Sequence, residues 1–225
     1  DQRADGHRSG IEPVLLAASI PARPGARVLE GGTGAGPALL CLAARVAGTA
    51  GIGIERDPTQ AALAQHNIAA NGFPDLQVLQ GDLAALLLEG AFDHAFANPP
   101  WHAAGGTASP DAGREGARRA EAGLFTLWAA RLAAPLRHHG TLSFVIAAGV
   151  LPDCLAAITA AACGSAAVLP LWPKPERAAR LVLLRAVKGG RGPCTLLPGL
   201  VLHRPEGGYT EAAEAVLREG APLAF

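Results

Sequence analysis

The tetrapeptide Asn98-Pro99-Pro100-Trp101 follows a short apolar segment, residues 92–97, that is typical of a buried strand. The two prolines fix φ at about −65° and donate no backbone hydrogen bond, so the strand must end here. The Asn98 side-chain oxygen and the Pro99 carbonyl oxygen can each accept an N–H hydrogen bond, and the Trp101 ring offers a face for stacking. Two interpretations follow: a proline turn over a buried tryptophan, or a rigid holder for a planar ligand.

A second candidate site is the glycine-rich segment "LEGGTGAG", residues 29–36, which follows another apolar segment. Its glycines allow a positive φ and let a ligand approach the backbone closely. The dinucleotide fingerprint GxGxxG would need glycine where Pro37 or Leu39 stands, so that interpretation is disfavoured. A P-loop is excluded because no Gly-Lys-Ser/Thr follows. The remaining pattern is acid-x-Gly-x-Gly-x-Gly, formed by Glu30, Gly32, Gly34 and Gly36.

Two further acidic residues stand where predicted strands end. Glu55 closes "GIGIE", and Asp82 follows "LQVLQ", with Leu83 beside it. A single acid in such a place is more often a solvated strand end or a helix cap than a ligand-binding group. Three acids at three successive strand ends, counting Glu30, favour a common binding site.

Apolar strands alternate with helical segments along most of the chain, which predicts an α/β fold: a doubly wound, mostly parallel seven-stranded sheet with right-handed crossovers. Ligands bind such sheets beyond the carboxyl ends of the strands. The predicted strands are residues 26–31, 51–55, 76–80, 92–97, 141–147, 166–172 and 179–187. The predicted helices are residues 37–46, 58–70, a short one between 80 and 92, then, after a loop at 103–117, residues 119–134, 152–162 and 209–220, the last with Thr210 as N-cap.

Length and composition indicate one globular domain over residues 1–225. We divide it into an N-terminal cap segment (1–25), a catalytic core (26–188) and a C-terminal tail (189–225). Basic and acidic residues balance at 19 each, so no global field favours nucleic acid or membrane. The four cysteines show no metal-binding spacing, which predicts no metal site, and they favour a reducing cytoplasm. The most apolar region, residues 141–172, is interrupted by glycine, proline and aspartate, so no membrane span is predicted. The absence of methionine indicates that the encoded chain begins earlier.

The glycine loop and the strand-end acids resemble the class I S-adenosylmethionine-dependent methyltransferases. Because a sulfonium cofactor carries no phosphate, its loop must seat an amino acid and a ribose. The resemblance implies that Glu55 accepts the ribose hydroxyls and that Asp82 meets the adenine amino group. The implied cofactor-binding residues are Glu30, Gly32, Thr33, Gly34, Gly36, Glu55, Arg56, Asp82, Leu83 and Asn98.

In amino-methyltransferases of this class, Asn/Asp-Pro-Pro-aromatic follows the fourth strand, and residues 98–101 match in kind and place. The resemblance implies that the carbonyl oxygens of Asn98 and Pro99 hold a planar amine in line with the methyl group, so positioning and electrostatics carry the catalysis. Pro99 and Pro100 keep the corner rigid, and Trp101 stacks on the substrate. The implied catalytic residues are Asn98, Pro99, Pro100 and Trp101.

Flanking segments resemble one branch, the bacterial tRNA(Val) adenine-N(6)-methyltransferases, which act on the 6-amino group of the adenine next to the anticodon. They are "DGHRSGIEPVLLAA" (5–18), "KPERAARLVLLRAVKGGRG" (174–192) and "YTEAAEAVL" (209–217). Within the first, "SGIE" has two compatible interpretations, a capping box of Ser9 with Glu12 and a turn over the cofactor. Two alternatives to an RNA substrate stay open: methylation of a glutamine amide on a protein such as a release factor, or an inactive cofactor-binding interaction module.

Residues 172–191 carry a net charge of +5 in a chain of zero net charge. A solvated face is the usual explanation for such a run. Beside a holder for an adenine amine, it becomes a candidate phosphate-binding rim for RNA. The predicted rim residues are Arg114, Arg118, Lys174, Arg177, Arg180 and Lys188.

Overall fold

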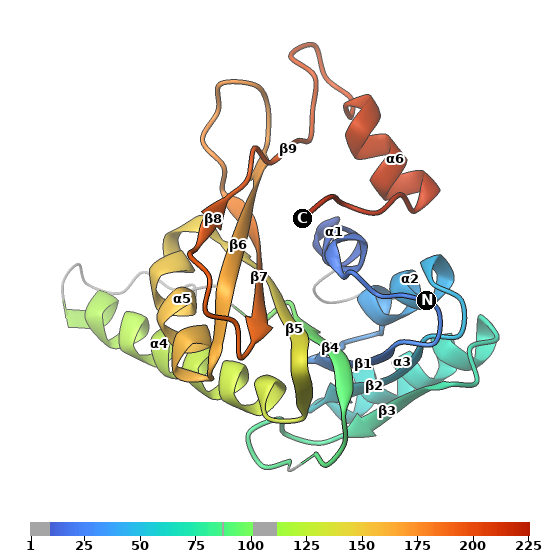
Figure 1. Ribbon diagram of the computed structural model, residues 1–225. Helices are drawn as coiled ribbons and strands as arrows, with labels where there is room; N and C mark the ends of the chain where they lie inside the picture. Colours follow the sequence, from blue (N-terminus) through green and yellow to red (C-terminus); the bar gives the residue numbers. More distant parts are fainter. Residues whose placement is uncertain (1–9, 87, 101–111) are drawn as a thin grey trace.

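A central twisted β-sheet organises the protein, as the computed structural model shows for residues 10–86, 88–100 and 112–225 (Figure 1). The strands are β1 (Arg27–Gly31), β2 (Ala50–Glu55), β3 (Leu76–Gln80), β4 (Phe92–Ala97), β5 (Leu136–Ala147), β6 (Cys163–Trp172), β7 (Leu181–Lys188), β8 (Thr195–Leu196) and β9 (Leu200–Val201). The helices are α1 (Glu12–Ser19), α2 (Pro37–Arg45), α3 (Pro58–Ala70), α4 (Ala112–Ala133), α5 (Leu151–Ala160) and α6 (Glu211–Glu219), with a 3-10 turn at Ala148–Val150.

The strand order across the sheet is β3-β2-β1-β4-β5-β7-β6-β8, with β9 also paired to β6. Strands β1 to β5 pair in parallel, whereas β7 runs antiparallel to both β5 and β6. The order reverses between β1 and β4, which pair directly although two strands separate them in sequence. Such a switch point leaves a crevice at the carboxyl ends of the two strands.

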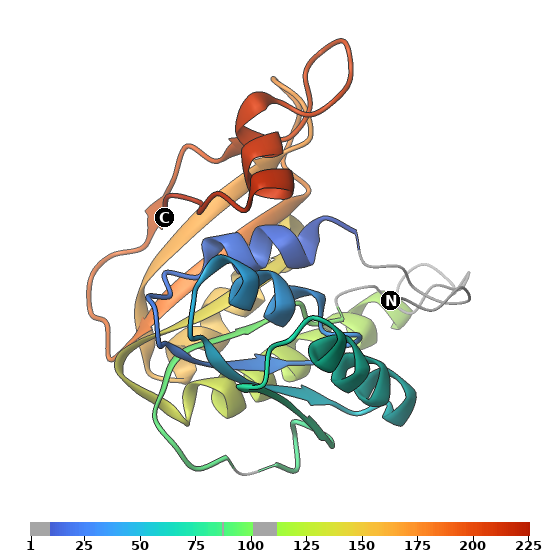
Figure 2. The same ribbon diagram turned by 90° about the vertical axis from the view of Figure 1, so that its right-hand side faces the viewer.

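Helices cover both faces of the sheet and divide the core into two apolar clusters (Figure 2). Leu15, Leu39 and Val216 come from α1, α2 and α6 and belong to the cluster on one face. Phe125 and Ile158 come from α4 and α5 and belong to the cluster on the other. The central strand β1 is thus covered on both sides and buried from Val28 to Gly31, whereas the edge strand β3 alternates buried and exposed residues.

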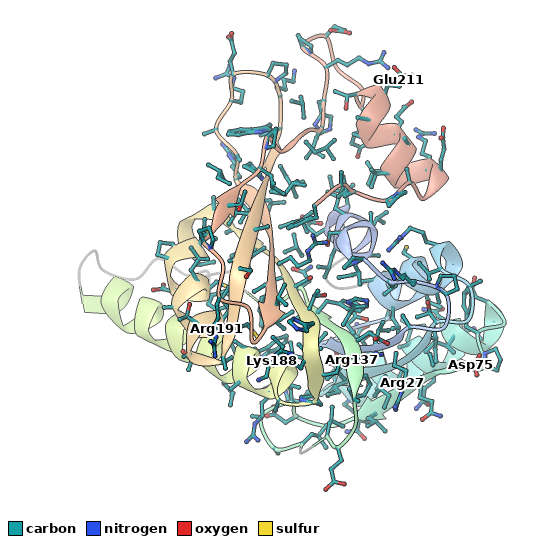
Figure 3. The ribbon with its side chains drawn as sticks, viewed as in Figure 1. Arg27, Asp75, Arg137, Lys188, Arg191 and Glu211 are labelled. Carbon is teal, nitrogen blue, oxygen red and sulfur yellow. The ribbon has the colours of Figure 1, made fainter. Side chains whose placement is uncertain are left out.

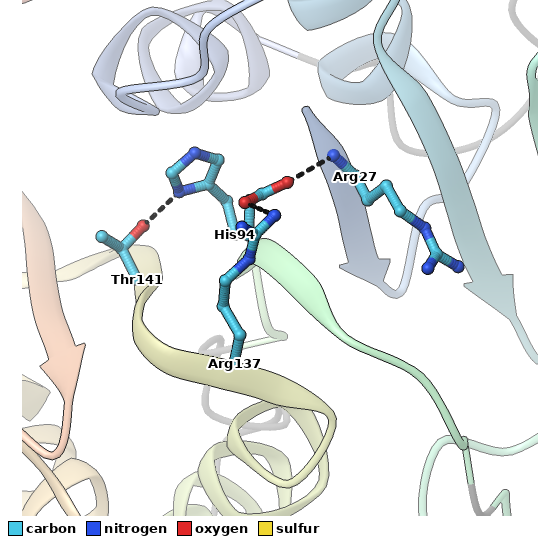
Figure 4. Close-up of polar contacts among 5 residues, drawn as sticks. Arg27, His94, Arg137 and Thr141 are labelled. Atoms are coloured by element: carbon cyan, nitrogen blue, oxygen red, sulfur yellow. Dashed lines mark hydrogen bonds and ion pairs between the residues drawn. The ribbon is translucent and has the colours of Figure 1, made fainter. Parts of the chain in front are cut away.

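The amino ends of β1, β4 and β5 are joined by polar contacts (Figure 4). Asp93 accepts a hydrogen bond from the backbone N–H of Arg27 at 2.8 Å and forms an ion pair with Arg137. His94 Nδ1 lies 2.8 Å from Thr141 Oγ1. Burial lowers the pKa of His94 to about 4, and the charges of Arg185 and Arg45 add to this effect. These contacts hold the register of the strands whose opposite ends form the candidate site.

Helix α3 and strands β3 and β4 have the predicted bounds, and local signals explain why. Asp57 caps α3 by accepting hydrogen bonds from the backbone N–H groups of Thr59 and Gln60, and Pro58 occupies the first helical position. Gly72, with φ of 73°, follows its end. The predicted cap of α6 is confirmed as well, because Thr210 Oγ1 accepts from the N–H of Ala213 at 3.1 Å.

Several predicted boundaries were wrong. The described residues between β3 and β4 form a turn in place of the predicted short helix, in keeping with the high cost of nucleating a helix of few turns. Helix α4 begins at Ala112, inside the predicted loop, since its alanine, arginine and glutamate residues outweigh a cost of about 1 kcal/mol for each glycine. Strand β5 begins at Leu136, five residues before the predicted start. The added residues are mostly polar and include His139 at a positive φ, so this part of the sequence resembles a turn more than a strand.

The sheet has nine strands in the described part of the chain, two more than the seven predicted. The additions, β8 and β9, are two residues long and flank Pro198-Gly199, so they lack any periodic signal. The predicted capping box is also wrong. Helix α1 begins at Glu12 with Ile11 as its N-cap and no side-chain cap, while Ser9 lies outside the described residues.

Candidate active site

Four strand ends converge at the switch point, as parallel pairing requires. Gly31, the last residue of β1, pairs with Ala97, the last residue of β4, so Gly32 and Asn98 follow side by side. Glu55 pairs with Gln80 at the ends of β2 and β3, and Asp82 comes two residues later. Gly32 and Asn98, which are 66 positions apart in the sequence, thereby reach one edge of the sheet.

A cavity of about 600 Å³ opens at this edge. That volume suits a small organic ligand. Eight of the predicted site residues line it: Gly32, Glu55, Arg56, Asp82, Leu83, Asn98, Pro99 and Pro100. Pro99 is buried and Asn98 half-buried, so the corner is fixed by packing while the asparagine side chain borders the cavity.

The glycine loop is held open by contacts with β2. The Thr33 N–H donates to the carbonyl oxygen of Ile54 at 3.0 Å, and the Gly34 N–H donates to Glu55 Oε2 at 2.8 Å. Gly32 has φ of 64°, and a Cβ there would lie 2.7 Å from the Trp128 ring. Both the backbone conformation and the close approach of this ring therefore require glycine.

Glu55 presents a pre-positioned carboxylate to the cavity. Its Oε2 accepts the Gly34 N–H, and its Oε1 accepts the Asp57 N–H at 2.8 Å. A carboxylate has about four acceptor positions, so it can still accept hydrogen bonds from two hydroxyl groups. Asp82 stands beyond the neighbouring strand, where its Oδ1 accepts the Ala84 N–H at 2.9 Å. Two acidic side chains thus lie along one wall of the cavity.

Glu30 lies beneath the glycine loop and does not line the cavity. It is 3% exposed, and its Oε2 accepts the Thr33 hydroxyl at 2.5 Å. Burial raises the pKa of Glu30 from 4.5 to about 8, against hydrogen bonds from Thr33 and the Leu39 backbone, while the charge of Glu55 raises it further. Thr33, Gly34 and Gly36 also lie outside the cavity wall. These four residues shape the loop and do not border the open space.

We expect Glu30→Gln to remove one component of the pH dependence of stability. Because the folded pKa of about 8 exceeds the unfolded value, Glu30 stabilises the fold fully below pH 4.5 and loses this contribution as pH rises through 8. Glutamine stays neutral throughout, so the Tm of the variant minus the Tm of the wild type should increase between pH 5 and pH 9. Thermal melts of both proteins without cofactor measure this, and parallel Tm curves would refute a raised pKa.

Helix α4 supplies an apolar wall that the sequence reasoning missed. Leu124, Leu127 and Trp128 line the cavity, and Trp128 covers Gly32. Their spacing of three and four residues places them on one helix face, which was the available signal. It did not distinguish a cavity wall from an ordinary core face. Gly10 and Glu12 also line the cavity, and both belong to the segment "SGIE" that the resemblance implies is a turn over the cofactor. The other lining residues missed from the sequence are Pro13, Ile54, Gly81 and Ala84.

The basic run at 172–191 does not form one surface. Arg180 lies at the carboxyl-terminal edge of the sheet, since its carbonyl oxygen accepts the N–H of Ala148, directly after β5. Lys174 and Arg177 are exposed in the same β6–β7 hairpin, which projects at the top of Figure 1. These three cations therefore share the edge that carries Asn98.

Lys188 lies at the opposite edge, because it ends the antiparallel strand β7 and pairs with Cys163 at the start of β6. Figure 3 shows it with Arg191 and Arg137 in the lower half of the molecule. Arg185 points into the protein, where it donates to the Phe225 carbonyl oxygen at 2.9 Å. Trp101 lies outside the described residues, as do the side chains of Arg114 and Arg118.

The described residues hold neither a metal-ligand group nor a membrane-spanning helix. No group of three or more His, Cys, Asp or Glu side chains in that part of the chain is placed to hold a metal ion. No helix among these residues has the length and apolar character needed to cross a membrane.

Known proteins share both sequence and fold with this chain. It is 34% identical over 143 residues to the tRNA1(Val) (adenine(37)-N6)-methyltransferase of Actinobacillus succinogenes, covering 62% of this chain and 60% of that protein. It is 42% identical over 76 residues to the ribosomal protein L11 methyltransferase of Myxococcus xanthus, covering 33% and 25%. The chain thus spans 60% or less of the length of these relatives.

The crystal structure of a predicted O-methyltransferase, Atu636 of Agrobacterium tumefaciens, has the same fold, with a TM-score of 0.78. The two chains are 22% identical, and the match covers 95% of this chain and 99% of that one. The family profile named "Methyltransferase small domain" matches residues 12–126, which hold the glycine loop, the strand-end acids and Asn98-Pro99-Pro100. The chain therefore belongs to the methyltransferase small domain family.

Proposed function

We propose that the chain methylates the exocyclic amine of an adenine in RNA, and that this RNA is a tRNA modified near its anticodon. The observation that carries the proposal is the Asn98-Pro99-Pro100 corner, which borders the cavity beside the glycine loop. The relative that methylates the N6 position of adenine 37 in a tRNA supports the choice of substrate. The three cations at the same edge of the sheet support binding of a polyanion.

The cavity suits S-adenosylmethionine, the proposed cofactor, in its size and in the hydrogen-bond acceptors that line it. Glu55 would accept the two ribose hydroxyls, Asp82 would accept the adenine amino group, and Ile54 and Leu83 would contact the apolar adenine ring. Gly32 lines the cavity, and the lack of a side chain there lets the Trp128 ring close over the loop beside the place proposed for the methionine part. When bound, S-adenosylmethionine supplies an electrophilic methyl group on a positively charged sulfur.

The corner would hold the amine by two carbonyl groups. The Asn98 side-chain oxygen and the Pro99 backbone oxygen each accept one N–H of the target amine, which turns the nitrogen lone pair towards the methyl group. Transfer of the methyl group would leave a surplus proton on the nitrogen, and this proton would pass to solvent. Pre-positioned acceptors of this kind need no reorganisation during the reaction, which is the main source of their effect.

Methylation of a protein is the second candidate. The relative named as a ribosomal protein L11 methyltransferase matches a shorter segment at higher identity. A glutamine side-chain amide, like an adenine amine, is a planar nitrogen with two N–H groups, so the same corner could hold it. Methyl transfer from labelled cofactor to total RNA, compared with total protein, separates the two. We expect label in RNA, and label confined to protein would overturn the proposal.

The hairpin cations provide a second test. Changing Lys174, Arg177 and Arg180 together to alanine should weaken tRNA binding and lower the slope of log affinity against log salt. The expected reduction is about 0.7–0.9 for each phosphate that is no longer neutralised, because fewer counterions are released. Cofactor affinity should not change. Lys188→Ala is the matched control, since it removes a cation of the same run at the opposite edge; equal salt slopes in the triple variant and the control would refute the hairpin as a phosphate-binding surface.

A further inference from the structure

We propose that Trp172 forms a second nucleotide-binding subsite, in which the base of a nucleotide flanking the target adenine stacks on its ring and Arg177 binds a phosphate. This inference rests on the proposed RNA substrate and adds a recognition element outside the cofactor cavity. It places the subsite on the β6–β7 hairpin and on the segment that holds it.

The Trp172 ring is fixed in position at the end of β6. Its Nε1 donates to the carbonyl oxygen of Pro198 at 3.0 Å. The Gly199 backbone packs directly against it, so that a Cβ at Gly199 would lie 2.6 Å from Nε1. Trp172 also pairs with Val201 of β9. A ring held in this way loses little conformational freedom when it binds a ligand, which favours affinity.

A cavity of about 440 Å³ lies against this ring. Its wall combines an aromatic face, small apolar neighbours and two cations, from Trp172, Lys174, Pro175, Glu176, Arg177, Ala178 and Val201. Arg177 and Lys174 are exposed against the single acid Glu176, and Arg180 follows, so the rim is cationic. An aromatic platform beside guanidinium and ammonium groups is the usual construction of a site for single-stranded nucleic acid.

The hairpin is also at a suitable distance from the proposed reaction. Three strand steps, from β4 through β5 and β7 to β6, separate Asn98 from Trp172 across the sheet. Strand pairing places Ala97 level with Val168 of β6, through Phe144 and Leu184. Trp172 comes four residues after Val168, so it lies beyond the level of Asn98 along the strand direction. Strand spacing and rise then give a separation of about 15–20 Å. A few nucleotides of an extended loop can cover this span.

Binding of bulk tRNA to the full chain tests the subsite. Trp172→Ala should weaken binding by about 5- to 150-fold, the range for removal of one stacked base, with an unchanged salt slope because the variant keeps every cation. Trp172→Phe keeps an aromatic face and should bind within a few-fold of wild type. Arg177→Ala should instead lower the salt slope. Ultraviolet cross-linking followed by peptide mass spectrometry should give a nucleotide attached to the peptide that contains Trp172.

Controls separate this inference from a folding defect and from the proposed function. Affinity for S-adenosylmethionine and the Tm report whether Trp172→Ala disturbs the fold. If they change, the ultraviolet cross-link of the wild type decides, and its absence from the peptide that contains Trp172 would overturn the inference. If the phenylalanine variant loses as much affinity as the alanine variant, or if the alanine variant binds tRNA as wild type does, stacking on Trp172 is refuted while RNA methylation stands. If the wild type itself binds no RNA and methylates protein, the proposed function fails first.

Discussion

Asn98→Ala is expected to lower turnover by about 100- to 1,000-fold while affinity for S-adenosylmethionine stays within a few-fold of wild type. Asn98 borders the cavity directly after β4, where its side-chain oxygen would accept an N–H of the target amine. Removal of one pre-positioned polar group at a reacting centre costs about 2.7–4 kcal/mol of barrier. Single-turnover rates measure the effect on chemistry, and calorimetry measures cofactor affinity.

Asn98→Asp is the matched control for this prediction. It keeps an acceptor oxygen at the same place and should retain far more activity than the alanine variant. Pro99 and Pro100 remain in both variants, so the backbone corner is preserved. If Asn98→Ala turns over at nearly the wild-type rate, residues 98–101 form only a proline turn, the structural interpretation that the sequence left open.

Glu55→Ala is expected to weaken S-adenosylmethionine binding by about 1.5–3 kcal/mol, or roughly 10- to 150-fold, the range for a hydrogen bond to a charged group. The variant removes the proposed acceptor for the ribose hydroxyls. It also releases the N–H groups of Gly34 and Asp57, which the carboxylate holds at 2.8 Å. The glycine loop then loses one of its anchors to β2, so the measured effect should fall in the upper part of this range.

Calorimetry with Glu55→Gln distinguishes these two contributions. Glutamine keeps one acceptor oxygen but places an N–H₂ group where the other stood, so it should lie between wild type and alanine. NAD should bind neither the wild type nor the variants, because the glycine loop lacks the dinucleotide fingerprint. Comparable binding of NAD and S-adenosylmethionine by the wild type would contradict the assignment of this cavity to the cofactor.

The sequence predicted the edge of the sheet at which the site forms because the physics of parallel strands is simple. Once Glu30, Glu55, Asp82 and Asn98 were placed at strand ends, parallel pairing brought those ends together. The predicted start of α3 at Pro58 and the predicted N-cap Thr210 were also confirmed. The position of a residue at a strand end does not show how deeply its side chain is buried. Glu30 lies buried under the loop, whereas Glu55 borders the cavity.

Contacts between distant elements could not be predicted from the sequence. The +5 run at 172–191 spans an antiparallel strand, so its two ends lie at opposite edges, and Lys188 is separated from Lys174. That strand direction follows from no local signal. Trp128 is similar, because a tryptophan on an amphipathic helix looks like a core residue until its contact with Gly32 is known.

Analysis of methylated nucleosides tests the central claim most directly. Bulk tRNA that lacks N6-methyladenosine would be incubated with the full chain and S-adenosylmethionine. It would then be digested to nucleosides and examined by mass spectrometry. The account predicts that N6-methyladenosine appears with the wild type and falls by about 100-fold or more with Asn98→Ala. Absence of N6-methyladenosine, together with methylglutamine in a parallel digest of labelled protein, would contradict it.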